Sequence, residues 1–135
     1  MADEGPRDAR RRVVVVNDDQ AILDLYRDML EELDYDPVTM VTHAIETDRI
    51  RAAAPDAVIL DLQVGQQAHY GVEMARELRS DARFIAVPIV VCTASAEALD
   101  GERAVLEAIG VPVLLKPFTS DEIDAVLHAP PSTQR

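Results

Sequence analysis

The stretch VVVVNDDQAILDLYRDMLEEL, residues 13–33, decides the fold. Its first four residues are apolar and β-branched, which is typical of a strand buried on both faces. Polar residues 17–19 end that run. Apolar side chains then recur every three or four positions, as on one face of a helix, at Ile22, Tyr26, Met29 and Leu33. The stretch therefore predicts a strand followed by an amphipathic helix, which Asp18 or Asp19 can cap.

The same alternation of strand and helix repeats to the end of the chain. Further strands are expected at 36–41, 56–61, 87–94 and 111–115. Further helices are expected at 42–54, 70–80, 95–110 and 120–129. Thr119 and Glu122 form a capping box that opens the last helix. Since doubly buried strands joined by helices form parallel sheets covered on both sides, the fold class is α/β, with five parallel strands in a three-layer sandwich.

A chain of 135 residues has room for one domain. We expect a flexible leader at 1–11, the domain at 12–128 and a tail at 129–135. The formal net charge of -12 disfavours direct nucleic-acid binding, which needs clustered Lys and Arg. The single basic cluster, Arg7 with Arg10, Arg11 and Arg12, is interpreted as a solvated tail.

The sequence contains no sign of a membrane or a secreted protein. No apolar run approaches the roughly 18 residues needed to cross a bilayer. The N-terminus lacks the apolar core of a signal peptide, and a single cysteine, Cys92, excludes an internal disulfide. We therefore expect a cytoplasmic protein without a membrane partner.

Polar residues follow the buried strands at their carboxyl ends. They are Asn17 and Asp18, Asp61, Thr93, and Lys116, which is the single lysine beside twelve arginines. In an open α/β sheet, ligands bind beyond the carboxyl ends of the strands. Two carboxylates and an amide oxygen there would suit Mg²⁺ or Mn²⁺, and a lysine and a threonine would suit phosphate oxygens. The set outlines a phosphoryl-transfer site.

At these residues the sequence resembles the receiver domains of two-component response regulators. The matching motifs are VVVVND, PDAVILDL, VPIVVCTA and LLKPF, in the family's order and over residues 12–128. The resemblance implies a flavodoxin-like (βα)₅ fold with strand order 2-1-3-4-5. It also implies a phosphoprotein that takes a phosphoryl group from a histidine kinase or a histidine phosphotransfer protein, and that is no enzyme beyond self-phosphorylation and dephosphorylation.

The resemblance also assigns roles to individual residues. Asp61 would be the phosphoacceptor and would bind the metal together with Asp18. The main-chain carbonyl of Gln63 would be a further metal ligand, and Asn17 would hold a metal-bound water. Each carboxylate could instead be a helix cap.

Two further residues would contact the phosphoryl group. Thr93 would move its hydroxyl to a phosphoryl oxygen, although it could simply be a strand-end residue, and Ser95 could be a plain N-cap. Lys116 would bond to Asp61 beforehand, because a compact ammonium reaches one oxygen where a planar guanidinium would not fit. Pro117, often preceded by a cis peptide bond in the family, would fix the direction of the Lys116 side chain.

Four features depart from the family pattern. Asn17 replaces an acidic residue, which lowers the expected affinity for Mg²⁺. Val113 replaces the usual aromatic residue three positions before Lys116. The loop after Asp61 lacks the family's proline, and the glycine that the family has eight residues after the aspartate would correspond to Gly71, ten residues on. The sequence stops soon after the last helix, so no effector domain is expected.

The leading hypothesis is a stand-alone receiver switched by phosphorylation. It would bind a downstream protein effector through the face formed by the fourth helix, the fifth strand and the fifth helix. The alternative is a degenerate receiver that is never phosphorylated and acts as a constitutive interaction module. A small phosphatase is disfavoured, because Gln63 stands where a second acid/base carboxylate would be needed.

Overall fold

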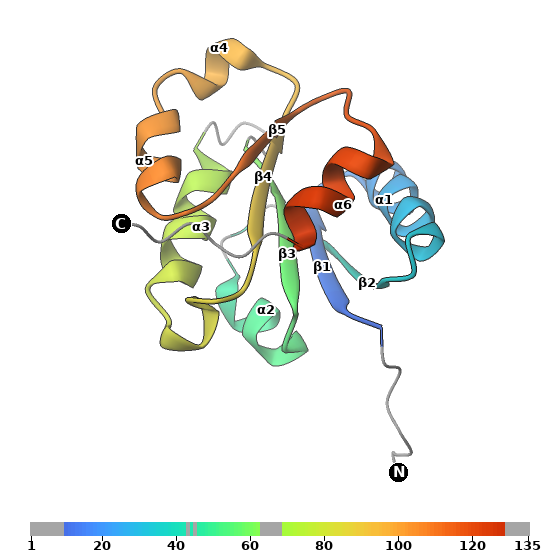
Figure 1. Cartoon of the computed structure of the whole chain (residues 1–135). Coiled ribbons are helices and arrows are strands. Elements are labelled where there is room, and N and C mark those ends of the chain that lie inside the picture. The colour runs from blue at the N-terminus through green and yellow to red at the C-terminus, as the bar shows by residue number, and fades with distance from the viewer. Residues whose placement is uncertain (1–9, 43, 45, 63–68, 129–135) are drawn as a thin grey trace.

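The computed structural model describes residues 10–42, 44, 46–62 and 69–128, and it contains a single parallel sheet (Figure 1). The strands are Arg12–Asn17 (β1), Asp36–Val41 (β2), Ala57–Asp61 (β3), Ile89–Thr93 (β4) and Val113–Leu115 (β5). They lie in the order β2-β1-β3-β4-β5, and all neighbours are parallel. The predicted fold class and strand order are therefore confirmed.

Helices cover both faces of this sheet (Figure 1). One layer consists of Gln20–Glu32 (α1) and Ser120–His128 (α6). The other consists of Thr47–Ala53 (α2), Tyr70–Arg79 (α3), Ala96–Leu99 (α4) and Arg103–Ala108 (α5). Within the described residues, none of these helices combines the length and apolar character needed to cross a membrane.

The β-branched run of β1 is buried from both sides, as its composition predicts. Val13 and Val15 pack with α1 and α6, whereas Val14 and Val16 pack with the helices of the opposite layer. All four side chains are at most 1% exposed. Successive side chains of a strand point to opposite faces, so a strand in the centre of a three-layer sandwich has no polar position.

The single helix expected at 95–110 is wrong, because two short helices, α4 and α5, take its place. The break falls at Asp100 and Gly101, both poor helix formers. Leu99 and Leu106 on either side are fully buried, so both halves keep their apolar anchor. The helix expected at 42–54 also begins later, at Thr47, and a short 3₁₀ turn at Ala82–Phe84 was not predicted.

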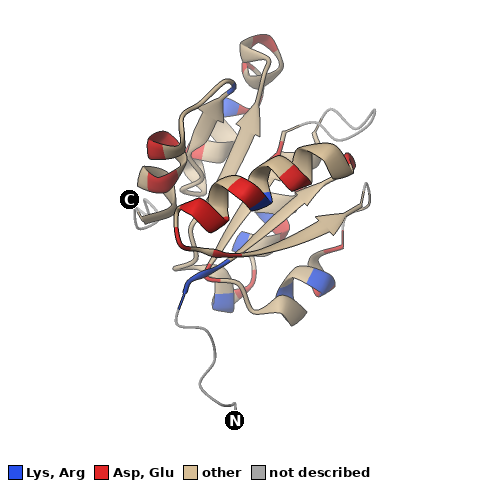
Figure 2. Cartoon of the chain, turned by 90° about the vertical axis from the view of Figure 1, so that its right-hand side faces the viewer, with Lys and Arg blue, Asp and Glu red and all other residues tan. Residues whose placement is uncertain are grey.

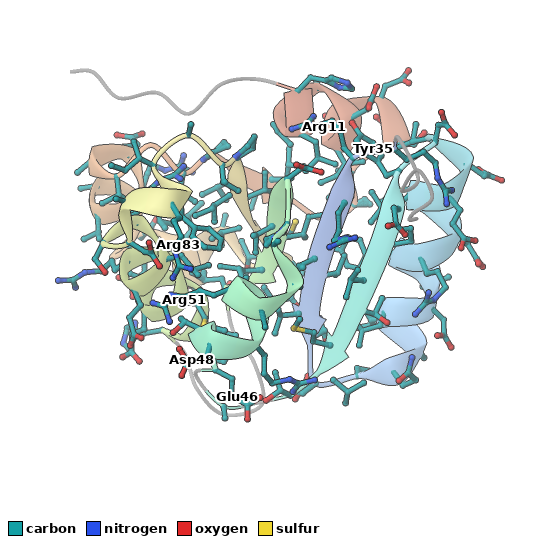
Figure 3. All side chains as sticks on the ribbon, turned by 90° about the horizontal axis from the view of Figure 1, so that it is seen from below. Arg11, Tyr35, Glu46, Asp48, Arg51 and Arg83 are labelled. Atoms are coloured by element: carbon teal, nitrogen blue, oxygen red, sulfur yellow. The ribbon has the colours of Figure 1, made fainter. Side chains whose placement is uncertain are left out.

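Residues 10–12 of the basic cluster do not form a solvated tail. The guanidinium of each donates to at least one backbone carbonyl. Arg11 donates to Leu127 at the end of α6 over 2.8 Å, and Arg10 donates to the carbonyl of Tyr35 over 3.2 Å. Arg11 and Tyr35 lie on the same side of the molecule as α6 (Figure 3). The solvated-tail interpretation is wrong for these three arginines, and the fourth lies outside the described residues.

Arg79 at the end of α3 joins the loops at the amino end of the sheet. Its guanidinium donates to four backbone carbonyls, at distances of 2.6–3.1 Å, namely those of Phe84, Val87, Ile109 and Gly110. Burial lowers the pKa of Arg79 below its usual range. Because the last carbonyls of a helix have no partner within it, one planar guanidinium here completes the end of α5 and the loop before β4.

We expect Arg79→Met to lower the free energy of unfolding by about 2 kcal/mol or more, since it leaves partly buried carbonyls unpaired while keeping the apolar stem. Urea unfolding followed by circular dichroism measures the change. Arg76→Met on the exposed side of the same helix is the matched control and should cost less than about 0.5 kcal/mol. Equal losses in the two variants would contradict this role for Arg79.

Candidate functional site

Asp61 and Lys116 meet at the carboxyl edge of the sheet. Asp61 is the last residue of β3, and Lys116 directly follows β5. The Lys116 ammonium lies 3.1 Å from Asp61 Oδ1, and the two side chains are 28% and 13% exposed. Since β4 lies between β3 and β5, the lysine reaches across the end of β4. Its own backbone N–H donates to the carbonyl of Thr93 on β4 over 2.8 Å, and the Lys116–Pro117 peptide bond is cis.

The Asp61 carboxylate occupies an environment that disfavours its charge. Burial raises the pKa of Asp61 above its usual value, and the nearby carboxylate of Asp18 adds to the increase. The positive charge of Lys116 and the hydrogen bonds from Lys116 and Asn17 act in the opposite direction. Burial is the largest of these effects, so without a cation the ionised form is not fully compensated.

Asn17 contributes a hydrogen-bond donor where the family pattern has a carboxylate. Its side chain is buried, and its Nδ2 donates to Asp61 Oδ2. Its Oδ1 accepts from the backbone N–H of Asp19 over 2.9 Å. The two Asp61 oxygens are thus occupied by Lys116 on one side and Asn17 on the other. The amide replaces a repulsive charge beside Asp61 by an attractive dipole.

Asp19 caps a helix, whereas Asp18 makes no such contact. Asp19 is the N-cap of α1 and accepts from the backbone N–H of Ala21 over 2.9 Å. Asp18 is exposed and makes no hydrogen bond or ion pair with any other described residue. The Asp18 and Asp61 carboxylates, close enough to interact, fit a hard cation that keeps several waters. No cluster of three His, Cys, Asp or Glu side chains suited to a metal occurs in the described part of the chain.

Thr93 lies at the same edge but is not bonded to Asp61. It is the last residue of β4, is 5% exposed, and its hydroxyl accepts from the backbone N–H of Ser95 over 3.1 Å. Ser95 is the N-cap of α4 and accepts from the backbone N–H of Ala98. The structure therefore brings Asn17, Asp61 and Lys116 into contact and leaves Thr93 beside them. Gln63 lies outside the described residues.

Tyr26 of α1 is a neighbour of this site that the sequence did not reveal. Its hydroxyl is buried and makes no hydrogen bond with any described residue. Burial raises the pKa of Tyr26 far above its usual range, and the Cys92 thiol and the Asp61 carboxylate add to the increase. In the sequence Tyr26 belongs to the apolar face of a helix. A hydroxyl on such a face is the one feature of the sequence that could have indicated a buried polar group near the site.

An apolar groove leads away from Lys116 along α1. It has a volume of about 350 Å³ and lies between α1 and the segment that joins β5 to α6. Its lining consists of Ile22, Leu25, Tyr26, Met29, Lys116, Pro117 and Phe118. The ring of Tyr26 contacts that of Phe118, with 6.2 Å between centroids, and Leu25 at the outer rim is 69% exposed.

The topology and the site define a class of protein, namely flavodoxin-like α/β domains with a buried carboxylate and a lysine at the carboxyl edge of the sheet. Comparison with protein families narrows the class. Residues 13–128 match the response regulator receiver domain. The chain belongs to this family, whose members are signalling modules of two-component systems.

Individual relatives agree with this assignment. The DNA-binding response regulator MtrA of Mycolicibacterium paratuberculosis is 29% identical over 120 residues, which are 89% of this chain and 51% of MtrA. The chain thus spans about half the length of that relative. The polar-differentiation response regulator DivK of Brucella ovis is 27% identical over 93 residues, which are 69% of this chain and 74% of DivK.

A solved structure supports the same conclusion. The receiver domain of the sensor histidine kinase PA1611 from Pseudomonas aeruginosa PAO1 superposes with a TM-score of 0.67 and 25% identity. The match covers 88% of this chain and 95% of that domain. That structure is described as having a magnesium ion coordinated in its active-site cleft.

We expect Asp61→Asn to be more stable than the wild type at pH 7 in EDTA. The folded state raises the pKa of Asp61, so it binds the proton more tightly than the unfolded state, and ionised Asp61 lowers the free energy of unfolding. The advantage of the variant should shrink as the pH falls through the ordinary carboxyl range. Urea unfolding at pH 7 and pH 4 measures it. Asp28→Asn, an exposed site on α1, is the control, and an advantage that grows towards acid would contradict the argument.

Proposed function

We propose that Asp61 accepts a phosphoryl group from the phosphohistidine of a histidine kinase or a histidine phosphotransfer protein. The observation that carries this proposal is the contact of Lys116 Nζ with Asp61 Oδ1 at 3.1 Å, at the edge where an α/β sheet binds ligands. Such donors would place the protein in the cytoplasm. The reaction is a transfer and not a hydrolysis of an external substrate, so the chain would act as a switch.

In this reaction an Asp61 oxygen attacks phosphorus in line, the O–P bond forms, and the P–N bond to the donor imidazole breaks. Lys116 would leave Asp61 Oδ1 and follow the transferred group, pairing with one phosphoryl oxygen. Bound Mg²⁺ or Mn²⁺ would neutralise charge on the phosphoryl oxygens. Asp18, Asp61 and the main-chain carbonyl of Gln63 would hold the cation.

Asn17 makes this site differ from one with three acidic residues. With one negative charge fewer, we propose that the site binds Mg²⁺ more weakly than such a site does. The Asn17 amide would have to release Asp61 Oδ2 or turn before its oxygen could hold a metal-bound water, because that oxygen now accepts from Asp19. Binding of the cation and rearrangement of Asn17 would then be linked.

Phosphorylation would change the surface around the β5 edge of the sheet. The proposed output face comprises α4 and α5, which together occupy the place of the expected fourth helix, with β5 and α6. Thr93 lies at its inner end, and its hydroxyl would turn from Ser95 to the phosphoryl oxygen. Leu115, 44% exposed on β5, would be a contact for a protein effector.

A second function remains open because of two residues. Asn17 already donates to Asp61 Oδ2 without a cation, and Val113 cannot serve as an aromatic switch. A receiver of this kind could act as a constitutive interaction module. The two functions differ in whether Asp61 reacts at all.

Incubation with acetyl phosphate or phosphoramidate and Mg²⁺, followed by intact mass spectrometry, tests the reaction. We expect one added phosphoryl group that is labile to base, that is absent without divalent cation, and that is absent in Asp61→Asn. Lys116→Ala should lose most of the product, because the transferred oxygens lose their cation. An unmodified wild-type chain after exposure to both donors would favour the constitutive module.

The groove beside Lys116 supports a docking surface for the phosphohistidine donor. It is apolar, it ends at the side chain that bonds Asp61, and it lies beside α1, a helix with several acidic residues. Figure 2 shows acidic residues along α1, which faces the viewer. The described residues of α1 and α6 include seven Asp or Glu and one Arg, which is Arg27. We propose that the donor inserts a helix with apolar residues flanked by basic ones.

We expect Leu25→Arg to slow phosphotransfer from a phosphorylated kinase or phosphotransfer domain by about tenfold, because it removes an exposed apolar anchor and repels a basic donor. Reaction with acetyl phosphate should be unchanged, since a small donor needs no docking surface. Ile85→Arg, at an apolar residue that is 54% exposed and outside the groove, is the control. Equal slowing with both donors would exclude a docking role for Leu25.

A further inference from the structure

The first turn of α3 lies against the backbone of Asp61. A Cβ atom built on Gly71 would lie 2.5 Å from the Asp61 carbonyl oxygen and 2.8 Å from Leu62 Cα. The Gly71 N–H donates to the carbonyl of Leu62 over 2.9 Å. Real Cβ atoms do not approach other atoms so closely, so glycine is required here. Any displacement of the Asp61 main chain is therefore transmitted to the start of α3.

His69 extends this contact to the other side of α3. It is the N-cap of α3, and its carbonyl accepts from the N–H of Glu73 over 3.0 Å, so it belongs to the same rigid turn. Its ring atom Nδ1 contacts Glu102 Oε1. The Glu102 side chain is only 12% exposed, whereas that of His69 is 67% exposed. A carboxylate so withdrawn from water needs a hydrogen-bond donor, and the imidazole is the partner that the structure gives it.

Glu102 stands at the corner between α4 and α5. Its N–H donates to the carbonyl of Leu99 over 2.8 Å, and its own carbonyl accepts from the N–H of Leu106 over 3.1 Å. The neighbouring Gly101 has no atom within 4 Å of a Cβ position. The corner therefore combines a flexible residue with one that is bonded to both helices. In Figure 1, α4 lies at the top of the view and α5 at its left, beside α3, whereas α1 lies at the right.

We propose that the His69–Glu102 contact couples Asp61 to the α4–α5 corner and so performs the transmission for which Val113 lacks an aromatic ring. A change at Asp61 passes through Gly71 to the first turn of α3, and His69 carries it to Glu102. The break in the expected fourth helix then has a role, because two short helices joined at Glu102 can reorient where one continuous helix could not. This inference rests on the proposed function, since it needs a phosphoryl group at Asp61.

The test compares the wild type with His69→Ala and Glu102→Gln by backbone NMR, with and without beryllofluoride and Mg²⁺. Beryllofluoride on Asp61 stands in for the phosphoryl group. In the wild type we expect shift changes at residues 60–62, at Lys116 and at residues 96–108. In both variants the changes near Asp61 and Lys116 should remain, and those at 96–108 should fall by half or more. Glu107→Gln, an exposed acid on α5, is the matched control and should respond as the wild type does.

The outcomes separate the two proposals. If the response at 96–108 persists in both variants while Asp61 still responds, the His69–Glu102 coupling is wrong and the phosphoacceptor function stands. If no shift appears near Asp61 in the wild type, the proposed function fails and the coupling fails with it. The double variant shows whether His69 and Glu102 act together. If they do, the shift changes at residues 96–108 should fall no further in the double variant than in either single variant.

Discussion

The removal of the Asp61 carboxylate from water is the constraint on which the rest of this structure depends. A buried carboxylate is unfavourable unless each oxygen has a partner. Lys116 serves one oxygen and Asn17 the other, and these residues come from the ends of two further strands. Their meeting requires β1, β3 and β5 to be parallel, because only then do three carboxyl ends reach one edge. The strand order determines the rest, since Lys116 has to span the end of β4.

The single lysine and the arginines of this structure make different kinds of contact. Arg11 and Arg79 donate to backbone carbonyls, and Arg79 reaches four of them with a single planar group. That use exploits the width of a guanidinium and its many donors. At Asp61 a single ammonium at the end of a long stem contacts one carboxylate oxygen, over 3.1 Å. Arg11 and Arg79 therefore hold backbone segments together, whereas Lys116 contacts the carboxylate of the candidate site.

The sequence predicted the central strands, because continuous apolar runs leave few alternatives to a buried parallel sheet. That the strand-end residues Asp61 and Lys116 share one edge followed from the parallel sheet, and their direct bond was predicted from the resemblance to receiver domains. The sequence did not predict the break between α4 and α5. The apolar spacing from Leu99 to Leu106 suits one helix. Asp100 and Gly101, two residues of poor helix propensity, interrupt it. Nor did the sequence reveal that Asn17 donates to Asp61, since an amide offers both a donor and an acceptor and only its surroundings select one. The contacts of Arg79 could not be predicted either, because its four carbonyl partners lie in loops whose conformation the sequence pattern does not specify.

Asp61 belongs to both layers of the protein at once. Because side chains alternate along a strand, the Asp61 side chain points to the layer of α1 and α6. Its charge there contributes to the raised pKa of Tyr26. Its carbonyl oxygen lies on the opposite layer, against Gly71 at the start of α3. A displacement of the Asp61 backbone, at the very end of β3, would therefore press on the start of α3 in the other layer. Because Gly71 leaves no space for a side chain, the Asp61 backbone and the first turn of α3 pack directly against each other, and the proposed phosphoacceptor is thus in contact with both layers.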